Sequence, residues 1–295
     1  MKLMLDFDIT MGVPQRDVDD GLALLYVLGN PELELLGATT TFGNATLDIV
    51  HKTALDVWKD LGLAGRVPLH RGAASPRHRR SEAAEALAAA ADAHPGTLTV
   101  LGLGSVTNLM GAAEIDPDFF LKVGRIVLMG GLIKPLIING KEMRELNFSA
   151  DPLAAHTVLN SPAPVTVITG HLCLQALFTP ALYDTMNQGE GPAVFRYIRR
   201  MTEPWLKHIG GSYSIGGFHN WDATAALYLD SPELFEAGSL TFSATVQELR
   251  SGMLVGSAPP GRTLSVPTRI LDEAAFNRRL IDTWGRVILP EGPNP

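Results

Sequence analysis

The chain has 295 residues, of which 46% are hydrophobic and 19% are charged, and its net charge at pH 7 is −7. These values exclude a disordered chain, and the negative charge excludes a nucleic-acid partner, because phosphate binding needs clustered lysine and arginine. With a single cysteine, Cys173, and no apolar run near the roughly 20 residues that span a bilayer, we expect a cytoplasmic protein without disulfides or a membrane partner.

Apolar runs of strand length alternate with segments of helical periodicity along the first two thirds of the chain. In chain order, the pattern predicts a strand at residues 3–5, a helix at 22–28, a strand at 33–40, helices at 47–61 and 82–91, a strand at 98–103, a helix at 107–113, a strand at 125–129, a helix at 152–159 and a strand at 165–169. Strands that alternate with helices form parallel sheets. We therefore predict an α/β fold with a mostly parallel central sheet and helices on both faces.

The last third of the chain shows a different pattern. Residues 180–226 are mostly helical in character and are predicted to form a late cap segment. Residues 240–249 and 264–270 are predicted as late strands, and residues 273–287 as a closing helix. The sequence contains no internal repeat, low-complexity linker or clear boundary, so we expect residues 1–295 to form a single domain.

Polar and glycine residues follow the predicted strands directly. They occupy residues 6–8, 41–44, 103–105, 129–131 and 169–171. In open α/β sheets, ligands bind at the carboxyl ends of the strands. These segments are therefore expected to line the binding site.

Five aspartates lie within fifteen residues: Asp6, Asp8, Asp17, Asp19 and Asp20. Carboxylates this close repel one another unless a cation or protons compensate, and hard oxygen ligands suit Ca²⁺ or Mg²⁺. Asp17 is equally suited to capping the helix that begins near residue 18, and Asp6 to bonding nearby backbone at the strand end. For Asp8 and Asp20 together, the pattern favours metal binding.

A metal site formed by this cluster needs ligands from elsewhere in the chain. Asp222 is the candidate, because Trp221-Asp222-Ala223 opens an apolar helical stretch. The same position also suits a helix N-cap, so the residue alone does not decide between the two roles.

Taken together, several segments resemble the inosine-uridine-preferring nucleoside hydrolase family. They are, in the family's order, Leu5-Asp6-Phe7-Asp8, Asp19-Asp20-Gly21-Leu22, Thr41-Phe42-Gly43-Asn44, Gly104-Ser105-Val106-Thr107-Asn108, Met129-Gly130-Gly131, Glu145-Leu146-Asn147-Phe148 and Asp151-Pro152. Each piece alone is weakly specific, but the ordered set covers nearly the whole chain. The resemblance implies an enzyme that hydrolyses the N-glycosidic bond of ribonucleosides and works as a homodimer or homotetramer.

The resemblance also implies a set of site residues. One Ca²⁺ would be bound by Asp8, Asp20, Asp222 and the backbone carbonyl of Leu103, with Asp8 as the catalytic base. The nucleoside would be bound by Asp19, Asn44, Met129, Asn139, Glu145, Asn147 and Trp221. Within this set Asn139 and Glu145 are expected near the 5′-hydroxyl of the ribose.

Base recognition differs from the commonest family pattern, in which His-Asp stands where this chain has Trp221-Asp222. A tryptophan there resembles the purine-specific branch, in which an indole stacks on the base, so we expect purine preference and a role in purine salvage. Trp221 as an ordinary core aromatic is the alternative. His219 is either a leaving-group acid or a structural residue, and the second stacking aromatic is not located from the sequence.

Two further segments depart from the family pattern. The loop between Asp8 and Asp19 has ten residues, 9–18, where the family has three to five, and is expected to reshape or cover the site. His171-Leu172-Cys173 stands in place of the family's Asp-x-Thr, and Cys173 is expected to be a small buried residue.

Three other functions stay open on the sequence. Asp6-Phe7-Asp8-Ile9-Thr10 fits the Asp-x-Asp-x-Thr motif of haloacid dehalogenase-type phosphatases with Asp6 as nucleophile, although no later Gly-Asp-x-x-x-Asp metal motif follows. A non-catalytic nucleoside-binding homologue and a hydrolase of another N-riboside are the other two alternatives.

Overall fold

The computed structural model describes residues 1–186 and 191–290, and its centre is an eight-stranded sheet with the order β12-β13-β8-β5-β4-β1-β2-β3. The strands are β1 (Lys2–Phe7), β2 (Glu34–Thr40), β3 (Leu69–Arg71), β4 (Leu98–Gly102), β5 (Arg125–Met129), β8 (Val165–Ile168), β12 (Ser239–Thr241) and β13 (Thr263–Ser265). All neighbouring strands pair in parallel except β12 and β13. The predicted mostly parallel sheet is confirmed.

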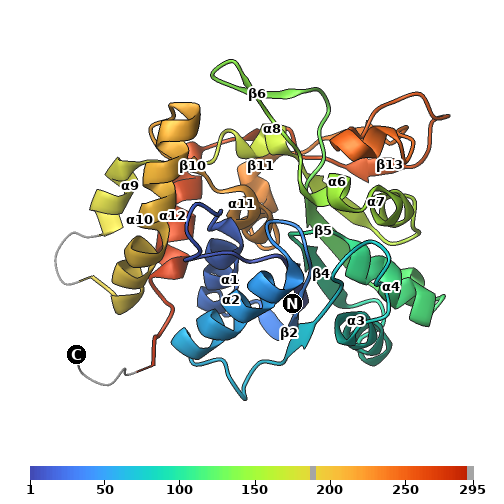
Figure 1. Ribbon diagram of the computed structural model, residues 1–295, viewed down its shortest axis with the longest axis horizontal. Helices are drawn as coiled ribbons and strands as arrows, with labels where there is room; N and C mark the ends of the chain where they lie inside the picture. The colour runs from blue at the N-terminus through green and yellow to red at the C-terminus, as the bar shows by residue number, and fades with distance from the viewer. Residues whose placement is uncertain (187–190, 291–295) are drawn as a thin grey trace.

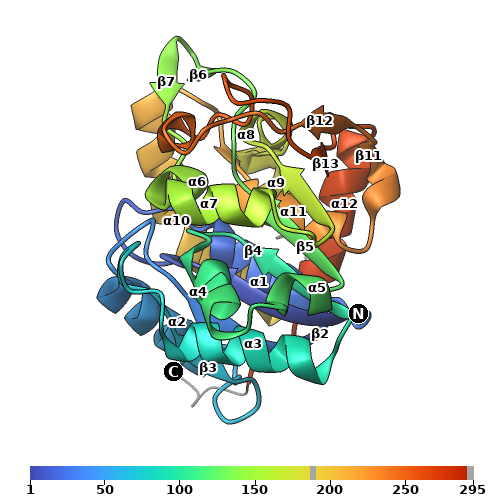
Figure 2. The same ribbon diagram turned by 90° about the vertical axis from the view of Figure 1, so that its right-hand side faces the viewer.

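Helices cover both faces of this sheet, as Figures 1 and 2 show. On one face lie α1 (Asp19–Gly29), α2 (Leu47–Asp60), α11 (Trp221–Tyr228) and α12 (Glu273–Trp284), and on the other α3 (Glu82–Ala93), α4 (Thr107–Ile115), α5 (Phe119–Lys122) and α7 (Pro152–Leu159). Side chains of a strand alternate between its two faces. In β1, Leu3 and Leu5 accordingly belong to the first core and Met4 to the second.

Shorter elements lie outside the central sheet. They are the hairpin β6 (Leu136–Ile138) and β7 (Lys141–Met143), the pairs β9 (Leu177–Phe178) with β10 (Phe218–His219) and β11 (Phe235–Glu236) with β14 (Arg269–Ile270), and the helices α6 (Asn147–Ala150), α8 (Gly170–Cys173), η1 (Pro232–Leu234) and η2 (Glu248–Ser251). The sequence did not predict these strands, because two or three residues do not establish a period.

The first of the two late strand predictions was wrong over most of its length, and the second was interrupted in the middle. The strand predicted at residues 240–249 ends at Thr241, and a reciprocal capping interaction then starts η2. In it, the Thr245 amide donates to Glu248 Oε2 at 2.8 Å and the Glu248 amide donates to Thr245 Oγ1 at 3.2 Å. The strand predicted at 264–270 divides into β13 and β14 around Pro267, which has no N–H for a sheet.

The predicted helical cap is confirmed where it is described, with residues 187–190 lying outside the described chain. The predicted segment contains α9 (Pro180–Met186), α10 (Ala193–Tyr213) and α11, which also covers one face of the sheet. Figure 1 places α9 and α10 beside α12, at the end of the molecule remote from α3 and α4. In the described part of the chain, no helix is both long and apolar enough to cross a membrane.

Candidate active site

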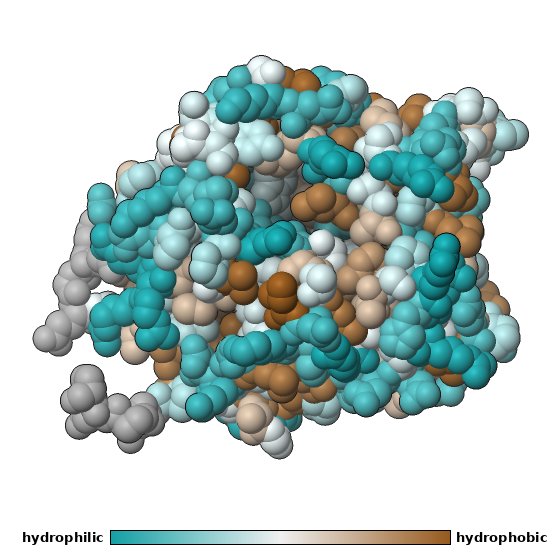
Figure 3. Space-filling model, viewed as in Figure 1, coloured by the Kyte–Doolittle hydropathy of each residue, from teal (hydrophilic) through white to brown (hydrophobic). Residues whose placement is uncertain are grey.

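A cavity of about 460 Å³ opens at the carboxyl ends of the central strands. Its lining comes from the loops after β1, β2, β4, β5 and β8, from α6, α10 and α11, and from the β6–β7 hairpin region. In the space-filling view the same face of the molecule is hollowed near its centre, and hydrophobic residues lie within a largely hydrophilic rim (Figure 3). The cavity therefore lies where the strand-end segments predicted it.

Three buried carboxylates meet beside this cavity. Asp19 and Asp20 begin α1, Asp222 is in the first turn of α11, and one carboxylate oxygen from each lies within 4.8 Å of the others. The two helices pack against each other, which brings together residues from distant parts of the sequence. In the described chain, none of the three forms an ion pair with a basic side chain.

Asp8 lies next to this group and is held by Asn44. The Asn44 amide donates to Asp8 Oδ2 at 2.6 Å, and Asn44 Nδ2 lies 3.2 Å from both Asp8 Oδ1 and Asp20 Oδ2. The Asp8 amide donates to Asp20 Oδ1 at 3.1 Å. A Cβ at Gly43 would lie 1.8 Å from Asp8 Oδ2, so only glycine permits this close approach. Asn44 thus fixes the carboxylates of both Asp8 and Asp20.

Burial and mutual repulsion destabilise the charged form of these carboxylates, and a bound cation would compensate for both. Burial raises the pKa of Asp8 to about 7 and that of Asp19 to about 6, and it raises the pKa of Asp20 and Asp222 as well. Repulsion between neighbouring carboxylates adds to the effect for Asp8, Asp20 and Asp222. Buried oxygen donors without a compensating base suit a hard divalent cation. The acidic cluster therefore fits a metal ion.

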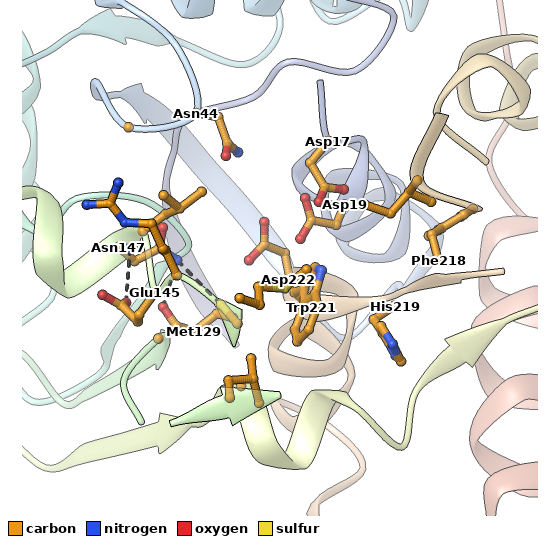
Figure 4. A pocket seen from close by; sticks show the side chains of 18 of the residues that line it. Asp17, Asp19, Asn44, Met129, Glu145, Asn147, Phe218, His219, Trp221 and Asp222 are labelled. Carbon is orange, nitrogen blue, oxygen red and sulfur yellow. Dashed lines mark hydrogen bonds between the residues drawn. The ribbon is translucent and has the colours of Figure 1, made fainter. Parts of the chain in front are cut away.

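Asn147 lies on the opposite side of the cavity, with Glu145 and Met129 (Figure 4). Its Nδ2 donates to the carbonyls of Leu103 at 3.0 Å and Met129 at 2.9 Å. A carbonyl oxygen has two lone pairs, so the Leu103 carbonyl keeps one for another ligand. The arrangement leaves Asn147 Oδ1 without a hydrogen bond in the described chain, available to a substrate hydroxyl.

Glu145 lines the cavity, but backbone amides occupy its carboxylate. Oε1 accepts from the amides of Gly131, Asn147 and Phe148, and Oε2 accepts from the amide of Ser149 at 2.7 Å. These bonds tie the loop after β5 to the start of α6. The observed role of Glu145 is therefore to order the cavity wall that carries Asn147.

Asn139 is the one expected substrate residue that the structure does not bring to the cavity lining. It sits in the β6–β7 turn with a φ of 48°, and its Nδ2 donates to the carbonyls of Tyr213 and Ser214 at 3.0 and 3.1 Å. Those carbonyls close the C-terminus of α10 and need donors. In the structure, Asn139 attaches the hairpin to α10.

The cavity has an aromatic side that the sequence located only in part. Trp221 and His219 are in its lining with ring centroids 5.0 Å apart, and Phe218 lies beside them. Helix α10 adds Trp205 and Tyr213 to the lining, which the sequence reasoning missed. Their spacing by eight residues, with Ile209 between, is the signal that they share one helix face.

His219 is a poor source of a proton at neutral pH. Its side chain is 7% exposed, and burial lowers its pKa to about 4. Its Nδ1 has no hydrogen-bond partner in the described chain. A neutral imidazole in contact with Trp221 fits a structural role better than that of a leaving-group acid.

Cys173 is fully buried, as expected. Its thiol donates to the Trp221 carbonyl at 3.4 Å, and burial raises its pKa. It packs in the same core as α1 and α11. This departure from the family pattern therefore supports the start of α11 and has no reactive thiol.

Asp6 is held by hydrogen bonds within the sheet region. It is fully buried outside the cavity lining, and its Oδ1 accepts from Thr39 Oγ1 at 2.6 Å and Asn108 Nδ2 at 2.7 Å. Asp17 lines the cavity, and its Oδ1 accepts from the Val18 amide at 2.7 Å. The phosphatase alternative needs Asp6 as its nucleophile, whereas these hydrogen bonds give Asp6 a structural role at the end of β1.

The parallel sheet, the strand-end cavity and the buried carboxylates form a site that suits a small molecule and a cation. The sequence model described as "Inosine-uridine preferring nucleoside hydrolase" matches residues 3–278. The chain belongs to this family and is a ribonucleoside N-glycosidase. Family membership also argues against a non-catalytic homologue.

Known relatives cover most of the chain. It is 28% identical to the inosine-uridine preferring nucleoside hydrolase of Crithidia fasciculata, over 85% of this chain and 88% of that protein. It is 32% identical to uridine nucleosidase 1 of Arabidopsis thaliana, over 79% and 75%. The structure of a purine-preferring ribonucleoside hydrolase from Gardnerella vaginalis is similar with a TM-score of 0.81, at 25% identity over 97% and 99% of the chains.

Proposed function

We propose that this enzyme hydrolyses ribonucleosides in a calcium-dependent reaction and prefers purine bases. The observation that carries the proposal is the group of buried carboxylates of Asp19, Asp20 and Asp222 beside a cavity with an aromatic side. A cation satisfies the first feature, and a flat nucleobase satisfies the second. We further propose a single domain over residues 1–295, a homodimer or homotetramer, and a cytoplasmic role in purine salvage.

The proposed calcium ligands are Asp8, Asp20, Asp222 and the carbonyl of Leu103. Ca²⁺ takes six to eight oxygen ligands, so water and ribose hydroxyls would complete its shell from the cavity side. In the structure, carboxylate oxygens of Asp19, Asp20 and Asp222 lie within 4.8 Å of one another, and the Asp8 amide is hydrogen-bonded to Asp20. Asp19 faces the cavity and is assigned to a ribose hydroxyl.

The reaction breaks the bond between ribose C1′ and the base nitrogen, and the electron pair leaves with the base. A water oxygen bonds to C1′, and Asp8 accepts the proton of that water. Bound calcium would orient the water and lower its pKa. The positive charge that develops on the ribose is stabilised by the surrounding carboxylates, while Asn44 and Asn147 hold the sugar in place.

The aromatic side of the cavity supports the purine preference. An indole such as that of Trp221 stacks well on a bicyclic base, and stacking makes the purine easier to protonate from solvent. The neutral state of His219 agrees with a mechanism that needs no side-chain acid. Among the relatives and similar structures, some are named for uridine or pyrimidine and others for purines or for inosine and guanosine, so the base preference is the point to test.

The proposed function predicts ribose release from a panel of nucleosides. With calcium, kcat/KM for inosine, guanosine and adenosine should exceed that for uridine and cytidine by about tenfold, consistent with stacking worth about 1–3 kcal/mol per base. The measurement is reducing sugar, with a phosphatase substrate as negative control. Equal rates for uridine would contradict the purine preference, and no ribose from any nucleoside with folded, calcium-bound protein would contradict the function.

Trp221 should determine this selectivity. Trp221→Ala removes the stacking surface, and we expect kcat/KM for inosine to fall by about tenfold, with a smaller loss for uridine. Trp221→Phe keeps an aromatic ring and should retain most of the activity. The ratio of inosine to uridine hydrolysis is the readout, because a general folding defect lowers both rates equally. An unchanged ratio in Trp221→Ala would assign the indole to the core.

A further inference from the structure

The loop of residues 9–18 between the first two acidic motifs has no part in the function proposed above. It is ordered by its own hydrogen bonds. The Val13 amide donates to the Thr10 carbonyl at 2.9 Å, the Arg16 amide donates to the Val13 carbonyl at 3.2 Å, and Thr10 Oγ1 donates to the Asp17 carbonyl at 2.9 Å. Successive turns therefore bring the end of the loop back to its start.

Two methionines anchor this loop to the helices on either side. Met11 is buried against α1, where a Cβ at Gly21 would lie 2.5 Å from its Sδ. At Gly12, a Cβ would lie 2.7 Å from Met201 Cε of α10. The loop is thus packed between α1 and α10, and its position is set independently of any ligand.

This packing places Arg16 against the loop after β2. Arg16 Nη1 donates to the Asn44 carbonyl at 2.6 Å. In the described chain this carbonyl has no other hydrogen-bond donor, because it belongs to the irregular segment between β2 and α2. The bond is charge-assisted, and it is exposed to solvent. Arg16 therefore restrains the backbone of Asn44 through its carbonyl oxygen.

The amide and the side chain of Asn44 hold the reacting carboxylates. Its amide and Nδ2 bond Asp8, and the same Nδ2 bonds Asp20. A series of hydrogen bonds thus runs from Arg16 through Asn44 to Asp8 and Asp20. Arg16 itself does not contact either carboxylate.

We propose that Arg16 is a positioning residue for catalysis, which holds Asn44 so that Asp8 and Asp20 keep their working geometry. The proposal rests on the proposed function. Groups that orient metal ligands from behind typically contribute 10- to 100-fold to metal affinity or activity. Because Arg16 also lines the cavity, direct substrate binding is the competing role.

Kinetics of Arg16 variants separate these two roles. For Arg16→Ala we expect kcat for inosine to fall by about tenfold with KM within about threefold, because positioning acts on the transition state. Arg16→Lys keeps a donor for the Asn44 carbonyl and should recover most of kcat. Arg278→Ala removes one charge from the exposed face of α12 and should match the wild type. A raised KM at unchanged kcat would overturn the proposal in favour of substrate contact.

Calcium titration by calorimetry gives a second readout that needs no substrate. We expect the calcium Kd of Arg16→Ala to rise by about tenfold, while its melting temperature without calcium stays close to that of the wild type. Unchanged calcium affinity together with unchanged kcat would overturn the proposal. If the wild type binds calcium but releases no ribose, the proposed function fails. The calcium Kd of Arg16→Ala then tests by itself whether Arg16 positions the metal ligands.

Discussion

Replacing Asp8 with alanine is expected to lower kcat for inosine by at least about 10³-fold, since general-base catalysis alone contributes about 10²- to 10⁴-fold. Asp8 is fully buried, and two hydrogen bonds from Asn44 fix its carboxylate next to Asp20. The variant loses both the proton acceptor and one proposed calcium ligand. Stopped-time assays of reducing sugar at saturating inosine, with calcium present, measure the effect.

Two further variants make this result specific to the carboxylate. Asp8→Asn keeps the shape of the side chain but accepts no proton, so it should be almost as inactive as the alanine variant. Asp282→Ala removes an exposed carboxylate of α12 and serves as the control for a general loss of negative charge. If Asp8→Asn retained more than about a tenth of the wild-type kcat, Asp8 would not be the base.

The calcium-free enzyme is expected to lose stability as pH rises from 5 to 8, by about 5 °C or more in melting temperature. The folded-state pKa of Asp8 is about 7 and that of Asp19 about 6, both above the ordinary value of 3.8. Below pH 4 the folded and unfolded chains hold the same protons, so these groups cost no stability. Between pH 4 and 7 only the folded chain retains them, and the free energy of unfolding falls as pH rises.

Calcium should reverse this loss. It binds the deprotonated carboxylates, so the rise in melting temperature on adding calcium should be larger at pH 8 than at pH 5. At 100 times its Kd, a ligand stabilises the folded state by about 2.7 kcal/mol. Differential scanning fluorimetry with and without a chelator measures both effects. Asp222→Asn has one fewer carboxylate and should show a weaker pH dependence and a smaller gain from calcium. A melting temperature independent of pH and calcium would contradict the proposed metal site.

The long elements of the fold could be predicted from the sequence because burial imposes a period on them. The strands of the central sheet and the helices that cover it are present as predicted, with ends that differ by a few residues. The failures are local. Pro267 interrupts one predicted strand, and the capping pair Thr245 and Glu248 ends the other, although both signals are present in the sequence. The apolar residues around these positions predict a strand more strongly than the proline and the capping pair predict its end.

The candidate site was predictable where it depends on topology. Residues at strand ends and helix starts must meet at one edge of a parallel sheet, so Asp8, Asp20 and Asn44 come together as expected. Side-chain direction was not predictable. Asn139 has the spacing of the family pattern, yet its turn directs the amide to the end of α10. Trp205 reaches the cavity only through the packing of α10, which no local pattern specifies.

The packing of α1 against α11 has a consequence for the order of folding. Asp20 and Asp222 are far apart in sequence, and only the docking of these two helices brings their carboxylates together. Such distant contacts form late in folding, since the entropy of closing the chain must be met first. A cation bound there adds interactions that the transition state lacks. Calcium should therefore slow unfolding and leave the folding rate nearly unchanged, so that it protects the enzyme kinetically.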